Sequence, residues 1–313
     1  MQRRRFLGQS LLTTGASIFA GANVFAGTKN NSNIYSSNPV ADKPFNLNYG
    51  IHDGMFKNTA GADFIDQIKY AYDMGFRAIE DNGMPGRPPE MQAKIGDTLA
   101  KLGMQMGVFV LNKGGNGANT LAAGKPEFVE VFLKGCREAV EVAKRCHGKL
   151  TTVVPGDFER NLTMGIQTGN VIEALRRGTE ILEKGNIVMV LEPLSDTPNL
   201  FLRNSDQTYM ICKAINNPSC KILFDMYHMQ KNEGNIITNI DKAWDEIGYF
   251  QIGDNPGRKE PTTGEMNYKN IFKHIYSKGY KGILGMEHGN SLPGKEGEAR
   301  LIAAYRESDN FLA

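Results

Sequence analysis

Short apolar runs that each end on a polar side chain recur along the second half of the chain, and they constrain its fold more than any other feature. The runs are IVMVLE, KILFD, IGYFQ and GILGME, and they end at Glu192, Asp225, Gln251 and Glu287. Continuous apolar runs are typical of parallel strands buried on both faces. Successive ends are separated by about 30 residues, which is the length of one strand, one helix and two loops. We therefore expect four parallel strands whose polar ends lie on one face.

The alternation of strand-like and helix-like segments extends over residues 46–313. Apolar runs predict eight strands, at 47–52, 76–80, 105–111, 149–155, 187–192, 220–225, 247–252 and 282–287. Eight strand–helix units over this length match a (β/α)8 barrel, which typically has about 250 residues. An open doubly wound sheet is the alternative, and it is disfavoured because no glycine-rich phosphate turn follows an early strand. The fold class is thus expected to be α/β, with one barrel domain at 46–313.

Helix boundaries are indicated by capping residues and by glycines. Asp63 is expected to cap the first long helix, which Gly75 ends. By the same pattern, Asn170 precedes a helix that ends at Gly185, and Ser205 precedes the next helix. The glycine-rich stretch LNKGGNGANT follows the third strand and is expected to form a loop at the barrel mouth.

The four polar strand ends predict a metal site. Glu192, Asp225, Gln251 and Glu287 offer hard oxygen donors, which suit Mg²⁺ or Mn²⁺. The carboxyl ends of barrel strands form the face where active sites gather, so the four side chains are expected to surround one opening. Any one of them could instead only cap the following helix, but four such coincidences in a row are much less expected.

A divalent cation at this position would stabilise the enediolate left when a carbon-bound proton is removed from a hydroxy-carbonyl compound. Glu192 and Glu287 lie at the ends of the fifth and eighth predicted strands, and each could ligate the cation through one oxygen and face the substrate with the other. One would then abstract the proton and the other return it. The alternative is that one of the two glutamates is only a metal ligand.

Charge excludes several classes of partner. The chain of 313 residues has a formal net charge of +2, and residues 1–26 contain three arginines and no acid. Without that segment 33 bases face 34 acids. A near-neutral chain of this kind gives no electrostatic reason to expect nucleic acid or an anionic membrane as partner.

The N-terminal segment resembles an export signal. Residues 1–26 begin QRRRFLGQS, continue through an apolar stretch rich in small residues, and end at a Val-Phe-Ala cleavage pattern. This resembles a twin-arginine signal and predicts a periplasmic protein that is free of the membrane after cleavage. An amphipathic helix or an uncleaved anchor is the alternative. Residues 27–45 are polar and are expected to form a tether before the barrel.

The four cysteines indicate no thiolate zinc site. Cys136 and Cys146 lie ten residues apart on one predicted helix, about 15 Å along its axis, and cannot pair with each other. Cys212 and Cys220 flank a helix-to-strand turn and could pair, although the sequence favours four free thiols. None of the spacings matches a zinc motif.

Several segments of the C-terminal half carry a family resemblance. VLEPLSDTPN, LFDMYHMQKNEGN, FQIGDNPGRKEPTTGEMNY and GMEHG are similar to the hydroxypyruvate isomerase branch of the xylose isomerase-like barrel superfamily, which also includes ketose 3-epimerases. The resemblance implies a metal at the four strand ends, the two glutamates as acid and base, and substrate contacts from His228 and Arg258. The epimerase branch usually has histidine where this chain has Gln251, so glutamine favours the hydroxypyruvate isomerase side.

His52 and Glu80 end two strands of the first half and could line the pocket and bind substrate, although structural capping is favoured for both. The segments around them, YGIHDG and AIEDNGMPG, depart from the family pattern, and so does the export signal. The expected function is therefore a metal-dependent isomerase or epimerase of a small hydroxy-carbonyl compound, with a sugar, a sugar acid or a hydroxy-keto acid as substrate.

Three other functions are alternatives to this one. A homo-oligomer is also compatible with the sequence. A metal-dependent lyase on 3-keto-glycosides would use the same proton abstraction, and a sugar-binding barrel would use none. A multi-zinc endonuclease of this fold needs a histidine-rich cluster and a basic groove. The five scattered histidines of this near-neutral chain argue against it.

Overall fold

Nine parallel strands form the sheet in the computed structural model, which describes residues 42–312. They are β1 (Asn48–Ile51), β2 (Ala78–Ile79), β3 (Gln105–Met106), β4 (Val108–Val110), β5 (Leu150–Val153), β6 (Val188–Leu191), β7 (Cys220–Asp225), β8 (Ile247–Gln251) and β9 (Ile283–Gly285). The strand order is β3-β2-β1-β9-β8-β7-β6-β5-β4. The predicted signal at 1–26 and most of the predicted tether lie outside the described residues and stay predictions.

The predicted third strand, 105–111, is divided in two at Gly107. Its first part, β3, pairs with β2, and its second part, β4, pairs with β5, so this segment links the two edges of the sheet into a nearly closed barrel. The Gly107 N–H donates to the Ile79 carbonyl at 2.7 Å. A Cβ at Gly107 would lie 2.4 Å from the Tyr249 hydroxyl oxygen, so only glycine fits this close approach. The predicted (β/α)8 barrel is confirmed, with eight strand positions of which one is interrupted.

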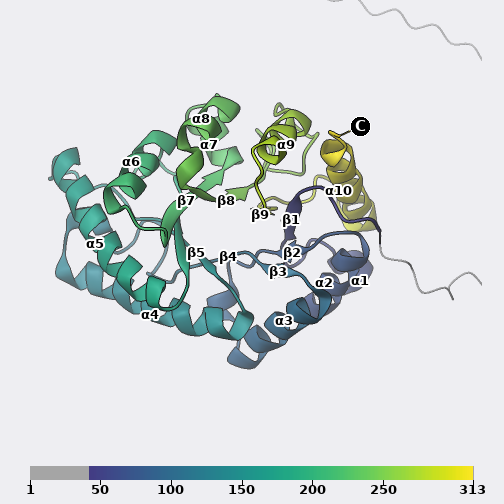
Figure 1. Ribbon diagram of the computed structural model, residues 1–313, viewed down its shortest axis with the longest axis horizontal. Helices are drawn as coiled ribbons and strands as arrows, with labels where there is room; N and C mark the ends of the chain where they lie inside the picture. The colour runs from purple at the N-terminus through teal and green to yellow at the C-terminus, as the bar shows by residue number, and fades with distance from the viewer. Residues whose placement is uncertain (1–41, 313) are drawn as a thin grey trace, which may run out of the picture. The chain divides into compact units, whose positions relative to one another are not determined.

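Helices cover the outside of the strands (Figure 1). They are α1 (Lys57–Ala60), α2 (Phe64–Asp73), α3 (Pro89–Leu102), α4 (Pro126–Cys146), α5 (Met164–Lys184), α6 (Ser205–Ile215), α7 (Met226–Asn232), α8 (Ile236–Ala243), α9 (Tyr268–Ser277) and α10 (Gly294–Asp309), with short 3₁₀ turns at Met84–Gly86, Leu121–Ala123 and Trp244–Glu246.

The helix caps were predicted with mixed success. The Asp63 side chain accepts a hydrogen bond from the Ile65 N–H and caps α2, as predicted. Asn170 was wrongly predicted as a cap, because α5 begins six residues earlier behind Thr163. The Asn170 amide instead donates to the Ala122 carbonyl at 2.9 Å. Ser205 is the first residue of α6 and not its cap, so that boundary was one residue off. The start of α5 contains Gly165 and Gly169 and exposes Met164 and Ile166, so the regular buried apolar positions begin only at Val171, which explains the error.

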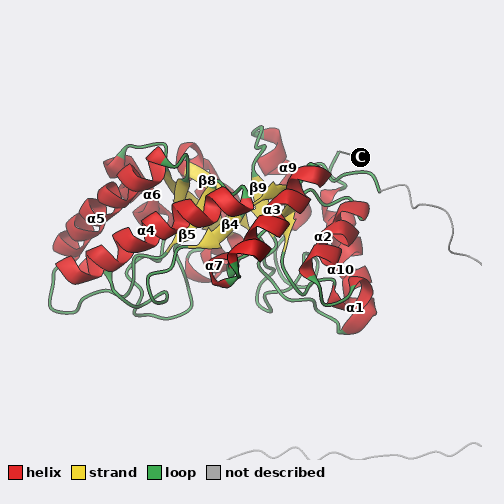
Figure 2. Ribbon diagram, turned by 90° about the horizontal axis from the view of Figure 1, so that it is seen from below, coloured by secondary structure: helices red, strands yellow, loops and turns green. Residues whose placement is uncertain are grey.

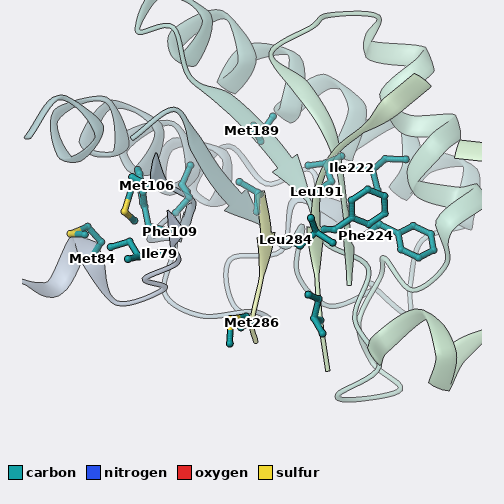
Figure 3. Close-up of a cluster of buried hydrophobic side chains, with 14 of the residues drawn as sticks. Ile79, Met84, Met106, Phe109, Met189, Leu191, Ile222, Phe224, Leu284 and Met286 are labelled. Carbon is teal, nitrogen blue, oxygen red and sulfur yellow. The ribbon is translucent and has the colours of Figure 1, made fainter. Parts of the chain in front are cut away.

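Two layers of apolar side chains hold the barrel together. The inner layer contains Ala78, Val108, Val190, Leu223, Tyr249 and Ile283. The outer layer lies between the strands and the helices and includes Leu191, Ile222, Phe224 and Leu284, which Figure 3 shows as sticks. Neighbouring residues of one strand therefore contribute to different layers, as the pleat requires. Both faces of each strand are buried, which explains why the strands were recognisable as continuous apolar runs.

The long connections after the strands lie on one side of the barrel. Figure 2 shows most loops, in green, along its lower edge, where α7 follows β7 directly. The four cysteines are buried free thiols in the described chain. Among residues 42–312 the structure contains no helix with the length and apolar character needed to cross a bilayer.

Candidate active site

The polar strand ends predicted from the sequence lie next to one another. In the sheet Asp225 pairs with Gln251, and Gln251 pairs with Gly285, two residues before Glu287. Glu192 directly follows β6, and its N–H donates to the Val153 carbonyl at 3.1 Å. The parallel register thus brings together four side chains that are far apart in the sequence.

Asp225 combines a helix cap with a place in this cluster. Its Oδ1 accepts from the Tyr227 N–H at 2.7 Å and from the His228 N–H at 3.4 Å, which caps α7. Its Oδ2 is free of the cap and accepts from Arg258 Nη2 at 3.0 Å. The functional prediction and the capping alternative are therefore compatible for this residue, because each role uses a different oxygen.

Arg258 connects two of the carboxylates. Its Nη2 lies 3.0 Å from Asp225 Oδ2 and 2.7 Å from Glu287 Oε2, and its Nε donates to the Glu287 carbonyl at 3.1 Å. The guanidinium also lies over the Tyr227 ring, 4.8 Å from its centroid. Arg258 is thus held at the cluster by charge, hydrogen bonds and a cation–π contact.

Glu192 is buried with little compensation. The residue is 6% exposed, and within residues 42–312 its carboxylate has one hydrogen-bond partner, the Thr152 hydroxyl at 3.4 Å. Burial, reinforced by the negative charges of Glu287 and Asp225, raises the pKa of Glu192 well above its usual value.

Glu287 is closer to solvent and has more partners. Its Oε1 accepts from Asn82 Nδ2 at 2.8 Å, and 24% of its side chain is exposed. Burial, with the charges of Glu80 and Asp225, raises the pKa of Glu287 to about 8, although Arg258 opposes the shift. The pKa values of both glutamates predicted to act as acid and base are therefore raised, as is common for groups that exchange protons at active sites.

Gln251 presents an unpaired oxygen. Its Nε2 donates to Glu80 Oε1 at 2.7 Å, whereas its Oε1 is buried without a hydrogen-bond partner in the described chain. A buried amide oxygen without a partner costs free energy of about 1–3 kcal/mol unless a cation, a water or a ligand completes it.

His228 lies beneath the cluster and is 1% exposed. The Ser195 N–H donates to its Nδ1 at 3.2 Å, so a neutral ring carries its proton on Nε2. That Nε2 lies 3.5 Å from Asp225 Oδ2 and forms no hydrogen bond within residues 42–312. Burial lowers the pKa of His228, and the charge of Asp225 only partly opposes this, so the ring is neutral.

A hollow of about 840 Å³ opens beside the cluster. His52, Asn82, Arg258 and Glu287 are among its lining residues, whereas Glu80 is not. A second hollow of about 320 Å³ lies under the glycine-rich loop and is also lined by Asn82.

His52 and Glu80 form a pair, with His52 Nε2 3.0 Å from Glu80 Oε1. Burial alone would lower the pKa of His52, but the charge and the hydrogen bond of Glu80 outweigh burial and raise this pKa. Of the predicted substrate-binding residues, the structure brings His52 and Arg258 to the larger hollow and keeps His228 and Glu80 below it.

The donor set fits a hard divalent cation. Three carboxylates, of which Glu192 has a single donor at 3.4 Å, and one unpaired amide oxygen are grouped at the strand ends, and hard oxygens are what Mg²⁺ and Mn²⁺ prefer. Ligand atoms of Glu192, Asp225 and His228 lie within 4.8 Å of one another. The His228 proton on Nε2 argues against a histidine ligand in this arrangement, so the four predicted oxygen donors remain the set we favour.

Several residues of the site were missed by the sequence analysis. Asn82 holds Glu287, Ser195 fixes the protonated nitrogen of His228, and Thr152 donates to Glu192. Asn82 and Ser195 follow strand ends by three and four residues, which is the one signal that could have indicated them. Thr152 lies inside β5 and gave no signal at all.

Comparisons with known proteins show the family and the fold. Residues 68–308 match the model of the xylose isomerase-like TIM barrel family. The hydroxypyruvate isomerase of Escherichia coli K12 is 32% identical over 161 residues, a match that spans 51% of this chain and 62% of that protein. The 2-oxo-tetronate isomerase of Cupriavidus necator is 26% identical over 72% of this chain and 86% of that protein. Among solved structures, the D-psicose 3-epimerase of Clostridium cellulolyticum H10 covers 85% of this chain and 99% of its own with a TM-score of 0.69 and 17% identity, which shows a shared fold.

Proposed function

Because this chain belongs to the xylose isomerase-like TIM barrel family, we propose that it is an isomerase or epimerase of a small sugar-like hydroxy-carbonyl compound that depends on a divalent cation. The names of its relatives, hydroxypyruvate isomerase and 2-oxo-tetronate isomerase, support the reaction class. The observation that carries the proposal is the pair of glutamates with raised pKa values next to an unpaired amide oxygen at the strand ends.

Glu192, Asp225, Gln251 and Glu287 would hold the cation. When bound, Mg²⁺ or Mn²⁺ supplies Lewis-acid stabilisation for negative charge that develops on substrate oxygens. Burial and, after it, the neighbouring negative charges raise both glutamate pKa values in the protein alone, and the cation would offset both by stabilising the charged carboxylates.

The two glutamates would move the proton. One carboxylate accepts a proton from the carbon next to the substrate carbonyl, and the other returns a proton to the neighbouring carbon or to the opposite face of the same carbon. The first outcome is isomerisation and the second is epimerisation. Asn82 Nδ2 keeps one oxygen of Glu287 in place and leaves the other to Arg258.

Arg258 and His228 would orient the substrate. Nε and Nη2 of Arg258 are engaged with Glu287 and Asp225, which leaves Nη1 to meet a carboxylate or hydroxyl in the hollow. The Nε2–H of His228 is a donor suited to a substrate oxygen, because Ser195 keeps Nδ1 as the acceptor.

Incubation of a panel of ketoses, aldoses, hydroxy-keto acids and 3-keto-glycosides in D₂O with Mn²⁺ tests this function. Turnover should place deuterium beside the carbonyl, and Glu192→Gln should remove that exchange. An unchanged product mass apart from deuterium indicates isomerisation or epimerisation, whereas loss of a leaving group indicates the lyase. Exchange that persists in the chelated protein would contradict the metal dependence.

We also propose that the protein acts after export. The basic start of residues 1–26 supports this, as described for the sequence. Lysine substitution of both Arg3 and Arg4 should retain the protein in the cytoplasm, as measured by cell fractionation. Unchanged distribution of the variant would contradict a twin-arginine route.

A further inference from the structure

An amide ligand raises a problem that a carboxylate ligand does not. The end of a glutamine side chain has an oxygen and an NH₂ group of nearly the same size, and only the oxygen can hold a cation. The β8 backbone places the Gln251 side chain at the strand end but does not determine which of the two atoms faces the site. Some neighbour must therefore fix the orientation of the amide.

Glu80 is placed to do this. It follows β2, is fully buried, and its Oε1 lies 2.7 Å from Gln251 Nε2. Its Oε2 accepts from the Tyr249 hydroxyl at 2.8 Å, and His52 Nε2 is 3.0 Å from Oε1. A carboxylate accepts hydrogen bonds and donates none, so Gln251 must turn its NH₂ toward Glu80. The amide oxygen then points away from Glu80, and it is this oxygen that has no partner in the described chain.

The space around Glu80 leaves its carboxylate little freedom. A Cβ at Gly285 would lie 1.6 Å from Glu80 Oε2, so the carboxylate fills the position above a glycine of β9. Gly285 is also the sheet partner of Gln251. The carboxylate is therefore held between β8 and β9 at the height of the amide it contacts.

Glu80 is separated from the place where a substrate would lie. The larger hollow is lined by His52 but not by Glu80, and the side chain of His52 is 21% exposed whereas that of Glu80 is 0% exposed. His52 thus lies between Glu80 and the hollow. The contact of Glu80 with Gln251 therefore suggests a second role for it beside the substrate contact predicted from the sequence.

We infer that Glu80 is a positioning residue for the metal site, which orients the Gln251 amide so that its oxygen and not its nitrogen faces the cation. This inference rests on the proposed function, because it takes Gln251 as a ligand. It assigns Glu80 a role in cation affinity beside the substrate contact predicted from the sequence.

Calorimetric titration of the purified full chain with Mn²⁺ tests the inference without any substrate. Glu80→Gln should weaken Mn²⁺ binding about 10–100-fold, the range typical of groups that orient metal ligands. Tyr249→Phe is the matched control, because it removes the hydrogen bond to Oε2 and leaves the Oε1 contact with Gln251 intact. It should bind Mn²⁺ like the wild type.

An exchange of the two side chains gives an independent test. The double variant Glu80→Gln with Gln251→Glu keeps one amide and one carboxylate in contact, so it should fold even if Glu80→Gln alone does not. The carboxylate at position 251 presents oxygen whichever way it turns. Mn²⁺ affinity should therefore return at least to the wild-type value.

The outcomes separate this inference from the proposed function. A wild-type protein that binds neither Mn²⁺ nor Mg²⁺ would overturn the metal dependence itself. Wild-type binding with equal affinity in Glu80→Gln would overturn the inference alone, and a raised KM in that variant would then support the predicted substrate contact as its role. A folded exchange variant that binds Mn²⁺ as weakly as Glu80→Gln would also overturn the inference.

Discussion

Glu80 and Glu192 are both buried at the carboxyl ends of strands of one barrel, yet their surroundings differ. Glu80 has three hydrogen-bonding neighbours within 3.0 Å, from His52, Tyr249 and Gln251. Glu192 has one, Thr152, at 3.4 Å. A buried carboxylate with a full set of donors belongs to the fold, whereas one without them destabilises the protein unless a ligand completes it. The number of hydrogen-bond partners therefore distinguishes the structural carboxylate of Glu80 from the functional one of Glu192, whereas burial does not.

The same contrast extends to the two sides of the mouth. On the β1–β2 side, the side chains of His52 and Glu80 are hydrogen-bonded to each other. On the β6–β9 side, Glu192 has a strongly raised pKa, Gln251 has an unpaired oxygen, and Asp225 and Glu287 share a single guanidinium. Within residues 42–312, buried atoms without a hydrogen-bond partner also occur at Asn48, Asn82 and Glu298, but the unpaired Gln251 oxygen and the poorly compensated Glu192 lie together at the strand ends that the proposed chemistry would use.

The largest expected effect concerns catalysis. Glu192→Gln should lower the rate of substrate-dependent deuterium exchange by about 10²–10⁴-fold, because it removes a group that accepts or returns a proton. Single-turnover exchange followed by NMR measures this. Lys69→Gln, which alters an exposed pair on α2 remote from the mouth, is the control and should exchange at the wild-type rate. Equal rates in Glu192→Gln and the control would remove Glu192 from the mechanism.

A second effect concerns stability and compares the two glutamates directly. Glu80→Leu should lower the free energy of unfolding of the metal-free protein by about 3 kcal/mol, because it leaves buried donors of Tyr249 and Gln251 without an acceptor. Glu192→Leu should leave it unchanged or raise it, because the Thr152 hydroxyl keeps the Val190 carbonyl as an alternative acceptor at 3.3 Å. Urea denaturation measures both variants. Similar losses in the two would contradict the distinction drawn here.

The pH dependence of stability sharpens the comparison further. The folded-state pKa of Glu287 is about 8, against 4.5 for the free side chain, so the folded chain binds more protons than the unfolded chain between these values. Stability from this group is complete below pH 4.5 and is lost as the pH rises toward 8. Glu287→Gln should flatten that loss in the metal-free protein, as measured by thermal unfolding from pH 5 to 8. Because 24% of the Glu287 side chain is exposed, solvent weakens this electrostatic effect on stability. A profile identical to that of the wild type would refute the assignment.

The smallest effect separates the two roles of Asp225. Asp225→Ala should cost about 1 kcal/mol of stability, because α7 loses its cap. Asp225→Asn should cost less, because asparagine also caps helices, but it should still weaken Mn²⁺ binding, because it removes one negative charge from the ligand set. Chemical denaturation and calorimetric titration of both variants measure the two quantities. Asparagine and alanine variants of equal stability would show that the cap contributes nothing here.

The strands of this fold were predictable for a physical reason. Each is buried on both faces, so its apolar run is unbroken, and β7 at 220–225 was predicted to the residue. The division into β3 and β4 at Gly107 could not be predicted in this way, since it depends on a close approach to Tyr249, which is far away in the sequence. The Asn170 error has a local cause, because the first turns of α5 expose their apolar residues Met164 and Ile166 and contain two glycines, so they show no buried apolar face.

The sequence by itself determined the barrel, its register of polar strand ends and the identity of the candidate acid, base and ligands, because a strand period and a strand end are local properties. Only the tertiary structure decided which buried polar groups are satisfied. Asn82 meets Glu287 across 205 residues and Glu80 meets Gln251 across 171. Hydrogen bonding is short-ranged in space and indifferent to separation along the chain, so the partners of these side chains become known only when the strands close into a barrel.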